Sequence, residues 1–428
     1  MAKQPKLQFP KKFLWGAATA AHQVEGGLHN QWSVSELEMA KTRAQQAEYQ
    51  LRDLENWPDI KSAAKNPDNY VSGSAVDHRH HYEEDFDTLA SLNLNAFRFS
   101  VEWSRLEPKE GGWDAEAITW YREYIAALKK RNIEPVMTLL HFTLPVWFVE
   151  KGGFEKRANV KYFVRFAEKV MAEIGKDVRY VITINEPEVY AGESYFNAEW
   201  PPAKSSRWLY FKVLNNQIRA HNKAAKAIHA LSRRHKVSIA KNSPYVYPGD
   251  DAWLSRVSAA VIQYVLDDYV LKRVIKQCDF IGVNYYFSNR VYGYRIHNPN
   301  VELSDMGWDL APENIQFVLE RLAQKYKKPI LVTENGLADA RDTRRKQWLA
   351  KTIMAMSEAM RHDVKLIGYL HWSLIDNFEW AKGKWPRFGL VAYDYEKHTR
   401  TVRPSAKWYG AVVKKIRASS EKPASRRR

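Results

Sequence analysis

The 428-residue sequence predicts an α/β fold, a single (β/α)8 TIM barrel with an elaborated loop after the first strand. Short apolar, β-branched segments alternate eight times with longer segments in which apolar residues recur three or four positions apart. Eight strand-then-helix units favour one closed parallel sheet surrounded by helices, with functional groups at the carboxyl ends of the strands. No internal repeat or low-complexity linker indicates a second domain.

The predicted strands are short and rich in Val, Ile, Leu and Phe, as expected for a sheet that is covered on both faces. They span residues 13–18, 96–101, 135–141, 178–185, 236–240, 280–285, 330–334 and 366–372. The predicted helices have an apolar face of helical period. They include residues 117–130, 160–174, 209–231, 253–276, 313–326 and 343–360.

The main interruption of this alternation is the segment 28–74. Residues 32–54 have a helical pattern, and loops rich in Pro and Asn follow around Trp57 and Asn66. We interpret this segment as a long loop above the barrel mouth, where it shapes the outer part of a substrate site. The predicted catalytic barrel covers residues 1–417, and residues 418–428 form a basic tail that is expected to be disordered.

The composition is that of an ordinary globular protein, with 45% hydrophobic and 27% charged residues. The N-terminal residues lack an apolar core of signal-peptide length, and no apolar run is long enough to cross a membrane. We therefore expect a cytoplasmic protein without a membrane partner.

Cys278 is the only cysteine, so no intrachain disulfide can form. Its place at the start of an apolar strand predicts a buried, inert thiol.

The formal net charge of +17 raises the question of anionic partners. The basic clusters at residues 233–236 and 344–346 lie on or beside predicted helices, which indicates solvated faces. No recognised nucleic-acid-binding motif accompanies the charge. Nucleic acid is therefore not the expected partner, although a nucleic-acid role would predict salt-sensitive retention on DNA.

Two predicted strands end on a glutamate. The apolar run 178–184 leads to Asn185, Glu186 and Pro187, and Pro187 stops the strand because it lacks a backbone donor. The run 329–333 leads in the same way to Glu334. A carboxyl group at the lip of a barrel can have a pKa raised by burial. Two such carboxyl groups are what hydrolysis of a glycosidic bond requires, one as acid and one as nucleophile or base.

Thr-Ile-Asn-Glu-Pro at 183–187 and Val-Thr-Glu-Asn-Gly at 332–336 resemble the two signature segments of the family 1 glycoside hydrolases, which are retaining β-glycosidases. The resemblance extends over residues 13–409 and implies that Glu186 is the acid/base and Glu334 the nucleophile. It also implies that Arg98 and Tyr286 support the nucleophile. Phe142 and Thr143 depart from the pattern, because relatives commonly carry an acidic residue or Trp there.

The same resemblance implies a set of residues that bind the sugar. Hydroxyl groups of a sugar pair with carboxylate and amide groups, and its apolar C–H face stacks on aromatic rings. The implied sugar-binding residues are Gln23, His141, Asn185, Asn284, Tyr286, Trp372, Glu379 and Trp380.

Three histidines lie close together in the sequence and suggest a metal site: His78, His80 and His81. Their spacing does not complete a zinc ligand set, and Asp77 is more simply interpreted as a helix cap. Neither a metal nor an organic cofactor is expected.

The sequence thus predicts a retaining, exo-acting β-glycosidase that hydrolyses terminal non-reducing β-D-glucosyl, galactosyl or fucosyl residues. Its expected partners are small β-glycosides or short β-linked oligosaccharides. The alternative is a catalytically silent carbohydrate-binding or scaffold protein on the same barrel, since a fold does not guarantee a function.

Overall fold

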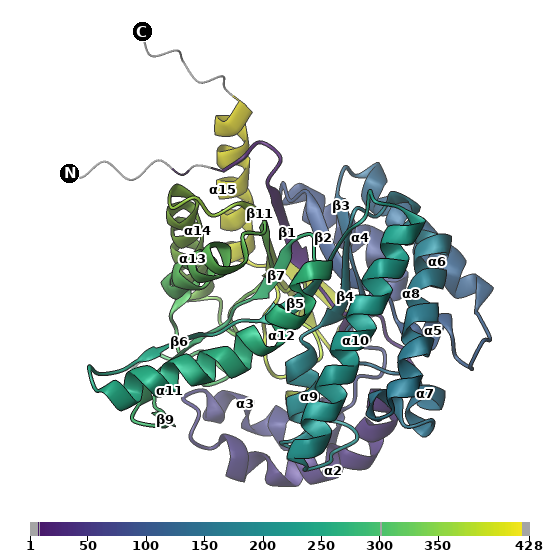
Figure 1. The fold of residues 1–428 in the computed structure, drawn as a ribbon, viewed down its shortest axis with the longest axis horizontal. Helices are drawn as coiled ribbons and strands as arrows, with labels where there is room; N and C mark the ends of the chain where they lie inside the picture. The colour runs from purple at the N-terminus through teal and green to yellow at the C-terminus, as the bar shows by residue number, and fades with distance from the viewer. Residues whose placement is uncertain (1–6, 8, 300–301, 422–428) are drawn as a thin grey trace.

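Eight parallel strands close into a barrel in the order β1-β11-β10-β7-β5-β4-β3-β2, which confirms the predicted fold class (Figure 1). This computed structural model describes residues 7, 9–299 and 302–421. The barrel strands are β1 (Leu14–Ala18), β2 (Ala96–Ser100), β3 (Glu134–Leu140), β4 (Tyr180–Asn185), β5 (Lys236–Asn242), β7 (Ile281–Asn284), β10 (Ile330–Asn335) and β11 (Leu366–Trp372). Each predicted strand corresponds to one of them, with differences of at most a few residues at the ends.

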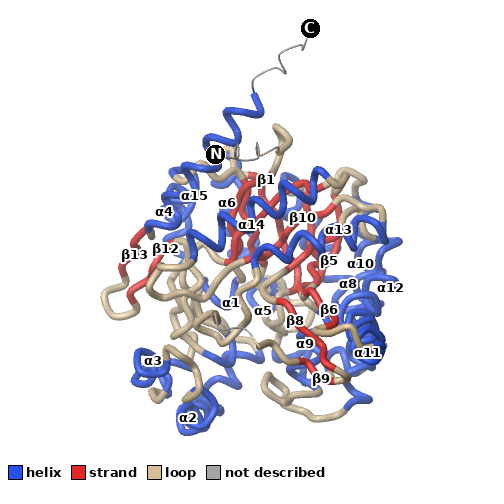
Figure 2. Tube along the Cα trace, turned by 90° about the vertical axis from the view of Figure 1, so that its left-hand side faces the viewer, coloured by secondary structure: helices blue, strands red, loops and turns tan. Residues whose placement is uncertain are grey.

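Helices surround the barrel, as Figure 2 shows. They cover strands that are themselves buried on both faces, so most strand residues are nearly inaccessible to solvent. The helices that follow barrel strands are α4 (His78–Ser91), α6 (Ala115–Lys130), α8 (Val160–Ile174), α10 (Arg207–Leu231), α11 (Trp253–Gln263), α12 (Tyr269–Val274), α13 (Ile315–Tyr326), α14 (Arg345–Arg361) and α15 (Pro404–Glu421).

Two helix predictions need correction. The helix predicted at 253–276 is interrupted by a π-helical turn, Tyr264–Asp268, which separates α11 from α12. The predicted tail boundary at Ala418 lies inside α15, so residues 418–421 are helical, and residues 422–428 lie outside the described residues. Among the described residues, no helix is both long and apolar enough to cross a membrane.

The long segment after β1 forms α1 (Ala21–Val24), α2 (Gln31–Leu51) and α3 (Trp57–Ala64). Helix α2 corresponds to the helical pattern predicted at residues 32–54. Asn30 caps α2 because its side chain accepts from the backbone of Trp32 and Ser33. Figures 1 and 2 show α2 and α3 at one end of the barrel. The short helices α5 (Trp103–Leu106), α7 (Val146–Glu150) and α9 (Pro187–Tyr195) follow β2, β3 and β4.

Two small sheets lie outside the barrel and were not predicted. One joins β6 (Tyr245–Pro248), β8 (Ser288–Tyr292) and β9 (Arg295–Ile296), and the other joins β12 (Val391–Asp394) and β13 (Thr399–Val402). Their strands are too short to show a period in sequence.

The ends of β10 and β11 approach each other closely, and Gly336 makes this possible. A Cβ atom at this position would lie 1.7 Å from the backbone oxygen of Trp372, a distance that no side chain tolerates. The turn after Glu334 therefore requires glycine. This contact sets the position of Glu334 relative to the loop that follows β11.

Candidate active site

The carboxyl ends of the strands surround a cavity of about 560 Å³. Its wall combines acidic and aromatic side chains, as expected for a site that takes a sugar. The acidic residues are Glu186, Glu193, Glu199, Glu334 and Glu379, and the aromatic residues are Phe142, Trp200, Tyr286, Phe287, Trp308, Trp372, Trp380 and Phe388. The predicted residues Glu186, Glu334, His141, Tyr286, Trp372, Glu379 and Trp380 all line this cavity.

Glu334 lies at the end of β10 between a cation and a phenol. Arg98 Nη1, on β2, donates to Glu334 Oε1 at 2.5 Å, and Tyr286 Oη donates to Oε2 at 2.7 Å. Arg98 is fully buried, so its charge requires this carboxylate partner. Burial raises the pKa of Glu334, while Arg98 and Tyr286 oppose that rise. Both oxygens of Glu334 are thus stabilised in the ionised state.

Glu186 has a different environment. It is the N-cap residue of α9, with a left-handed backbone (φ 39°) that follows from the abrupt change from β4 to a helix beginning at Pro187. Asn284 Nδ2 donates to Glu186 Oε1 at 2.7 Å, and the Glu186 side chain makes no ion pair within the described part of the chain. Burial first, and then repulsion from Glu334 and Glu188, raises the pKa of Glu186 well above its usual value. Of the two carboxyl groups, Glu186 therefore holds the proton.

Asn185 links these groups to His141. Its Oδ1 accepts from Arg98 Nη2 at 2.7 Å and from Asn284 Nδ2 at 3.2 Å, so its Nδ2 faces His141 Nε2 at 3.2 Å. His141 Nε2 is then the acceptor and Nδ1 carries the proton. Burial and the charge of Arg98 hold the pKa of His141 well below its usual value, so the ring stays neutral. Nδ1 has no partner among the described residues and is available to a sugar hydroxyl.

Gln23 and Glu379 come from opposite ends of the chain. Gln23 Nε2 donates one hydrogen bond to Asn377 Oδ1 at 3.0 Å and another to the backbone oxygen of Phe378 at 2.7 Å. Only Oε1 of Gln23 remains, and it has no partner in the described residues. Burial and the charge of Glu334 raise the pKa of Glu379 to about 8. Glu379 therefore holds its proton more strongly than an exposed glutamate does.

The aromatic side of the cavity is built by stacking. His141 stacks against Trp372 (ring centroids 5.8 Å apart) and Trp380 (6.0 Å). Trp380 also stacks on His22 at 5.7 Å. Phe142, where the sequence departs from the family pattern, packs edge-on against Trp380 at 5.1 Å. These contacts hold the two tryptophans rigidly.

Several wall residues were not predicted from the sequence. Glu193, Glu199 and Trp200 follow β4, and Phe287, Met306 and Trp308 follow β7. They lie in segments that no strand-end pattern identifies. The aromatic content of these segments was the one signal available, and with 16 tryptophans in the chain it does not single out any of them.

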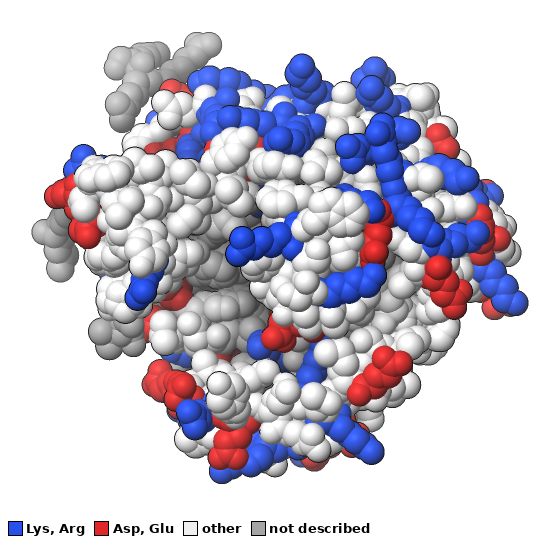
Figure 3. Space-filling model, turned by 60° about the horizontal axis from the view of Figure 1, so that its bottom comes forward, with Lys and Arg blue, Asp and Glu red and all other residues white. Residues whose placement is uncertain are grey.

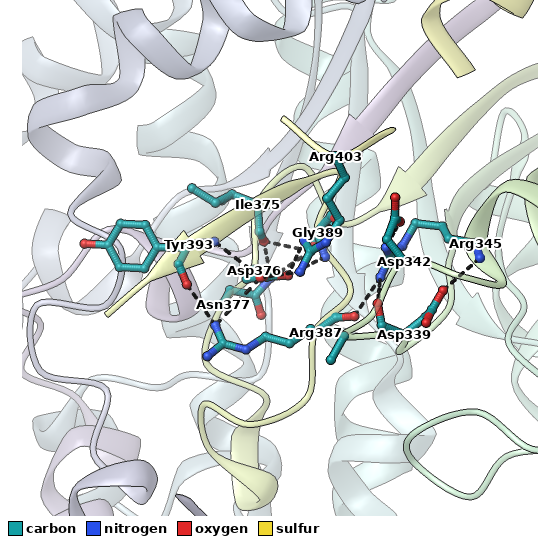
Figure 4. A network of polar contacts seen from close by, with 12 residues as sticks. Asp339, Asp342, Arg345, Ile375, Asp376, Asn377, Arg387, Gly389, Tyr393 and Arg403 are labelled. Atoms are coloured by element: carbon teal, nitrogen blue, oxygen red, sulfur yellow. Dashed lines mark hydrogen bonds and ion pairs between the residues drawn. The ribbon is translucent and has the colours of Figure 1, made fainter. Parts of the chain in front are cut away.

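The loop after β11 holds Glu379 and Trp380, and it is anchored by Asp376. Figure 4 shows Asp376 facing Arg403, with Gly389 and Tyr393 beside it. Arg403 donates to both carboxylate oxygens at 2.9 Å, and the Gly389 amide donates to Oδ1 at 2.9 Å. The buried ion pair fixes the chain that supports the cavity wall.

We expect Arg403→Met to lower the free energy of unfolding by about 3 kcal/mol, because it removes both hydrogen bonds of the ion pair and leaves the buried Asp376 with the more distant Arg387, at 3.7 Å, as its one remaining cation within the described residues. Chemical denaturation measures this loss. Lys65→Met is the matched control, since it breaks the exposed ion pair of Lys65 with Glu48 and should leave the unfolding midpoint almost unchanged. Equal losses in the two variants would contradict the anchoring role of Arg403.

The histidine cluster does not form a metal site. His78 contacts Asp85 Oδ2 at 2.7 Å and Tyr124 Oη at 2.8 Å. Asp77 occupies the N-cap position of α4, but its side chain accepts from His80 Nδ1 at 2.6 Å and makes no capping bond. Asp77 thus stands at the predicted cap position, but its side chain does not supply the capping hydrogen bond. Within the described ranges, no group of three or more suitable side chains could hold a metal.

Cys278 is buried against α10, and burial raises the pKa of its thiol to about 12. Its Sγ lies 3.5 Å from His221 Nε2, so the thiol is enclosed by protein. The thiol is therefore buried, as predicted, and its raised pKa disfavours the reactive thiolate.

A (β/α)8 barrel with two buried glutamates of unequal environment in one aromatic cavity is the arrangement of a glycoside hydrolase. The model of Glycosyl hydrolase family 1 matches residues 5–268 and 261–417 of the chain. The chain belongs to this family, and it is a β-glycosidase.

Relatives in the family support this assignment over nearly the whole chain. Beta-glucosidase A of Thermotoga maritima is 29% identical over 461 residues, covering 95% of this chain and 98% of the relative. A 1,4-beta-D-glucan glucohydrolase of Thermotoga neapolitana is 28% identical, with 95% and 98% covered. Among solved structures, a beta-glycosidase from Pyrococcus horikoshii matches with a TM-score of 0.84 and 33% identity, covering 97% of this chain and 99% of that one.

Proposed function

We propose that the enzyme is a retaining, exo-acting β-glycosidase in which Glu334 is the nucleophile and Glu186 the acid/base. The observation that supports this proposal is the unequal environment of the two carboxyl groups. Glu334 contacts Arg98 and Tyr286 through different oxygens, whereas Glu186 contacts only the amide of Asn284. An ionised nucleophile beside a protonated acid is the starting state of a double displacement.

In the first step Glu334 attacks the anomeric carbon and forms a glycosyl ester, while Glu186 gives its proton to the leaving oxygen. Neutralisation of Glu334 by the ester removes the repulsion that raised the pKa of Glu186. Glu186 is then a stronger acid than before and remains ionised, so it can accept a proton from water. The water attacks the anomeric carbon, the bond from that carbon to the Glu334 oxygen breaks, and the β-sugar leaves with Glu334 regenerated as a carboxylate.

The expected substrate is a β-D-glucoside, and galactosides and fucosides are further candidates. Similar proteins are named β-glucosidase and 1,4-β-D-glucan glucohydrolase, which supports glucose as the first sugar to test. Short β-linked oligosaccharides are also proposed substrates. The proposed location is the cytoplasm, in keeping with a single buried cysteine. A screen of nitrophenyl gluco-, galacto-, fuco-, manno- and xylosides ranks the sugars.

The retaining mechanism predicts that a β-glycoside first yields the β-sugar. This follows because each of the two displacements inverts the anomeric carbon, so the product keeps the β-configuration. Direct attack also requires the two carboxyl groups to lie about 5 to 5.5 Å apart, too close for an intervening water. A proton NMR time course of nitrophenyl β-glucoside hydrolysis measures the first anomer formed. Early appearance of the α-sugar would contradict retention, and absence of turnover on every glycoside of the screen would favour the catalytically silent alternative.

A further inference from the structure

Helix α11 exposes most of its large apolar side chains. Trp253 is 74% exposed, Val257 51% and Val261 56%, and these residues recur every four positions along one face. The opposite face, which packs against the barrel side, buries Ser255, Ala259 and Gln263, and Ala259 packs against Val246 and Val291. Gln263 Oε1 accepts from the Val246 amide at 2.9 Å, so the buried polar face has partners within the fold. A surface helix normally has the reverse orientation.

The exposed apolar surface continues beyond α11 in both directions. At one end the Gly293 amide donates to Ser255 Oγ at 2.8 Å, which places the β8–β9 hairpin with exposed Tyr294 and Ile296 beside the helix. At the other end the exposed Tyr264 and Val265 lead into α12. Tyr269 of α12 contacts Phe211, which is exposed near the start of α10 together with Trp208. We call this surface the α11 face.

Cations lie on the aromatic rings of the α11 face. Lys212 Nζ lies 4.2 Å from the ring centre of Trp208, Lys272 Nζ lies 4.8 Å from that of Tyr264, and the Arg295 guanidinium lies 5.5 Å from that of Tyr294. Within the described residues, none of these three cations forms an ion pair with a carboxylate. Two exposed acidic residues, Asp250 and Asp251, lie just before α11; Asp250 accepts from the Ala252 amide, and Asp251 pairs with Arg256 at 2.9 Å. The face thus combines apolar side chains, aromatic rings and positive charge.

We propose that the α11 face docks this protein on the surface of an anionic lipid bilayer. Tryptophan and tyrosine favour the boundary between lipid and water, and a helix that is apolar on its outer face lies in that boundary. Lys212, Lys272 and Arg295 are placed to meet lipid phosphates, each at the edge of the apolar surface. Contiguous exposed apolar surface of this kind marks an interaction site.

The charge of the whole chain favours a membrane over a second copy of this protein as the occupant. The net charge of +17 repels another copy but attracts an anionic surface. Docking on the surface needs no membrane-spanning helix, so it revises the expectation that membranes are not partners.

Figures 1 and 2 show α11 at the same end of the molecule as α2 and α3. Figure 3 shows a broad surface with few charged side chains beside a hollow. This inference does not depend on the proposed substrate.

Co-sedimentation with lipid vesicles tests the proposal. We expect binding to vesicles of phosphatidylcholine and phosphatidylglycerol in equal parts, weaker binding to phosphatidylcholine alone, and a decrease with added NaCl. The triple variant Trp253→Ser, Val257→Ser, Val261→Ser should bind the mixed vesicles about tenfold less tightly or worse, because it removes the apolar contacts. Lys212→Gln and Lys272→Gln should each weaken binding about fivefold.

Leu231→Ser with Met354→Ser is the matched control, because both side chains are about half exposed on α10 and α14, away from the α11 face. This variant should bind like the wild type, and the thermal unfolding midpoints of all variants show whether they are folded. Binding that is unchanged in the triple variant, or equal on the two kinds of vesicle, would overturn the proposal. Light scattering that finds a dimer in the wild type and a monomer in the triple variant would overturn it too, in favour of a second copy. None of these measurements uses catalysis, so their failure leaves the proposed function untouched.

Discussion

Glu334→Ala should abolish hydrolysis of every glycoside, whereas Glu186→Ala should lose activity according to the leaving group. Without Glu334 no covalent intermediate can form, whatever departs from the anomeric carbon. Without Glu186 the proton donor is missing, and general acid catalysis contributes about 10² to 10⁴ in rate. Dinitrophenolate departs without a proton, so the first step on a dinitrophenyl glucoside should survive in Glu186→Ala. Steady-state and burst kinetics on a series of aryl glucosides measure this difference.

Added azide separates the two roles independently. In Glu186→Ala the second step lacks its base, so the glycosyl ester should accumulate, and azide should release it as the β-glycosyl azide because azide needs no deprotonation. In Glu334→Ala azide can only replace the missing nucleophile and give the α-azide. Asn284→Ala is a useful control, since it removes the hydrogen bond to Glu186 but leaves both carboxyl groups in place. Formation of the β-azide by Glu334→Ala would show that the two roles are reversed.

Arg98→Met should move the acidic limb of the kcat/KM profile to higher pH. Arg98 lowers the pKa of Glu334, so its removal raises that pKa, and the nucleophile becomes protonated at a pH where it was ionised. An adjacent opposite charge lowers a carboxyl pKa by about 1 to 3, so the limb should move upward by a similar amount on the pH scale. On the acidic side of the displaced limb, kcat/KM should fall about tenfold for each further decrease of one in pH. The profile of kcat/KM against pH measures the effect.

Arg105→Met is the matched control for Arg98→Met. Arg105 is largely buried, with a side chain 14% exposed, and like Arg98 it pairs with a buried carboxylate, Glu25 at 3.0 Å, but it does not contact Glu334. Loss of either arginine should destabilise the fold, so both variants are measured at a temperature at which they remain folded. An acidic limb that moves equally in both variants, or in neither, would contradict a direct effect of Arg98 on the nucleophile.

The sequence by itself determined the barrel and the two central glutamates. The apolar runs that precede Glu186 and Glu334 are long enough for one buried strand each, and Pro187 and Gly336 mark where those strands stop. Parallel strands in a barrel end on the same side, so both glutamates were predicted to meet at one mouth. Local patterns suffice here because strand ends and turns depend on neighbouring residues.

The contacts that build the site join residues that are far apart in the chain, so strand-end patterns do not give them, and the pairing of Arg98 with Glu334 was implied by the family resemblance alone. Arg98 and Glu334 are 236 positions apart, and Gln23 is held by Asn377 and Phe378, more than 350 positions away. Only closure of the barrel brings such groups together. The tertiary structure also decides between the metal site and the structural role proposed for the histidine cluster, because His78 contacts Asp85 and Tyr124.

The α11 face illustrates the same limit most clearly. The period of residues 253–265 shows that the segment is a helix with one apolar side, and period alone assigns that side to the core. The structure places Trp253, Val257 and Val261 outside instead. The covered side of α11 meets the small β6-β8-β9 sheet at close range, where Ala259 packs on Val246 and Val291 and the polar groups of Ser255 and Gln263 accept from backbone amides, so small and polar side chains are the ones buried. Periodicity identifies two faces of a helix, but only the packing of the chain decides which of them is covered.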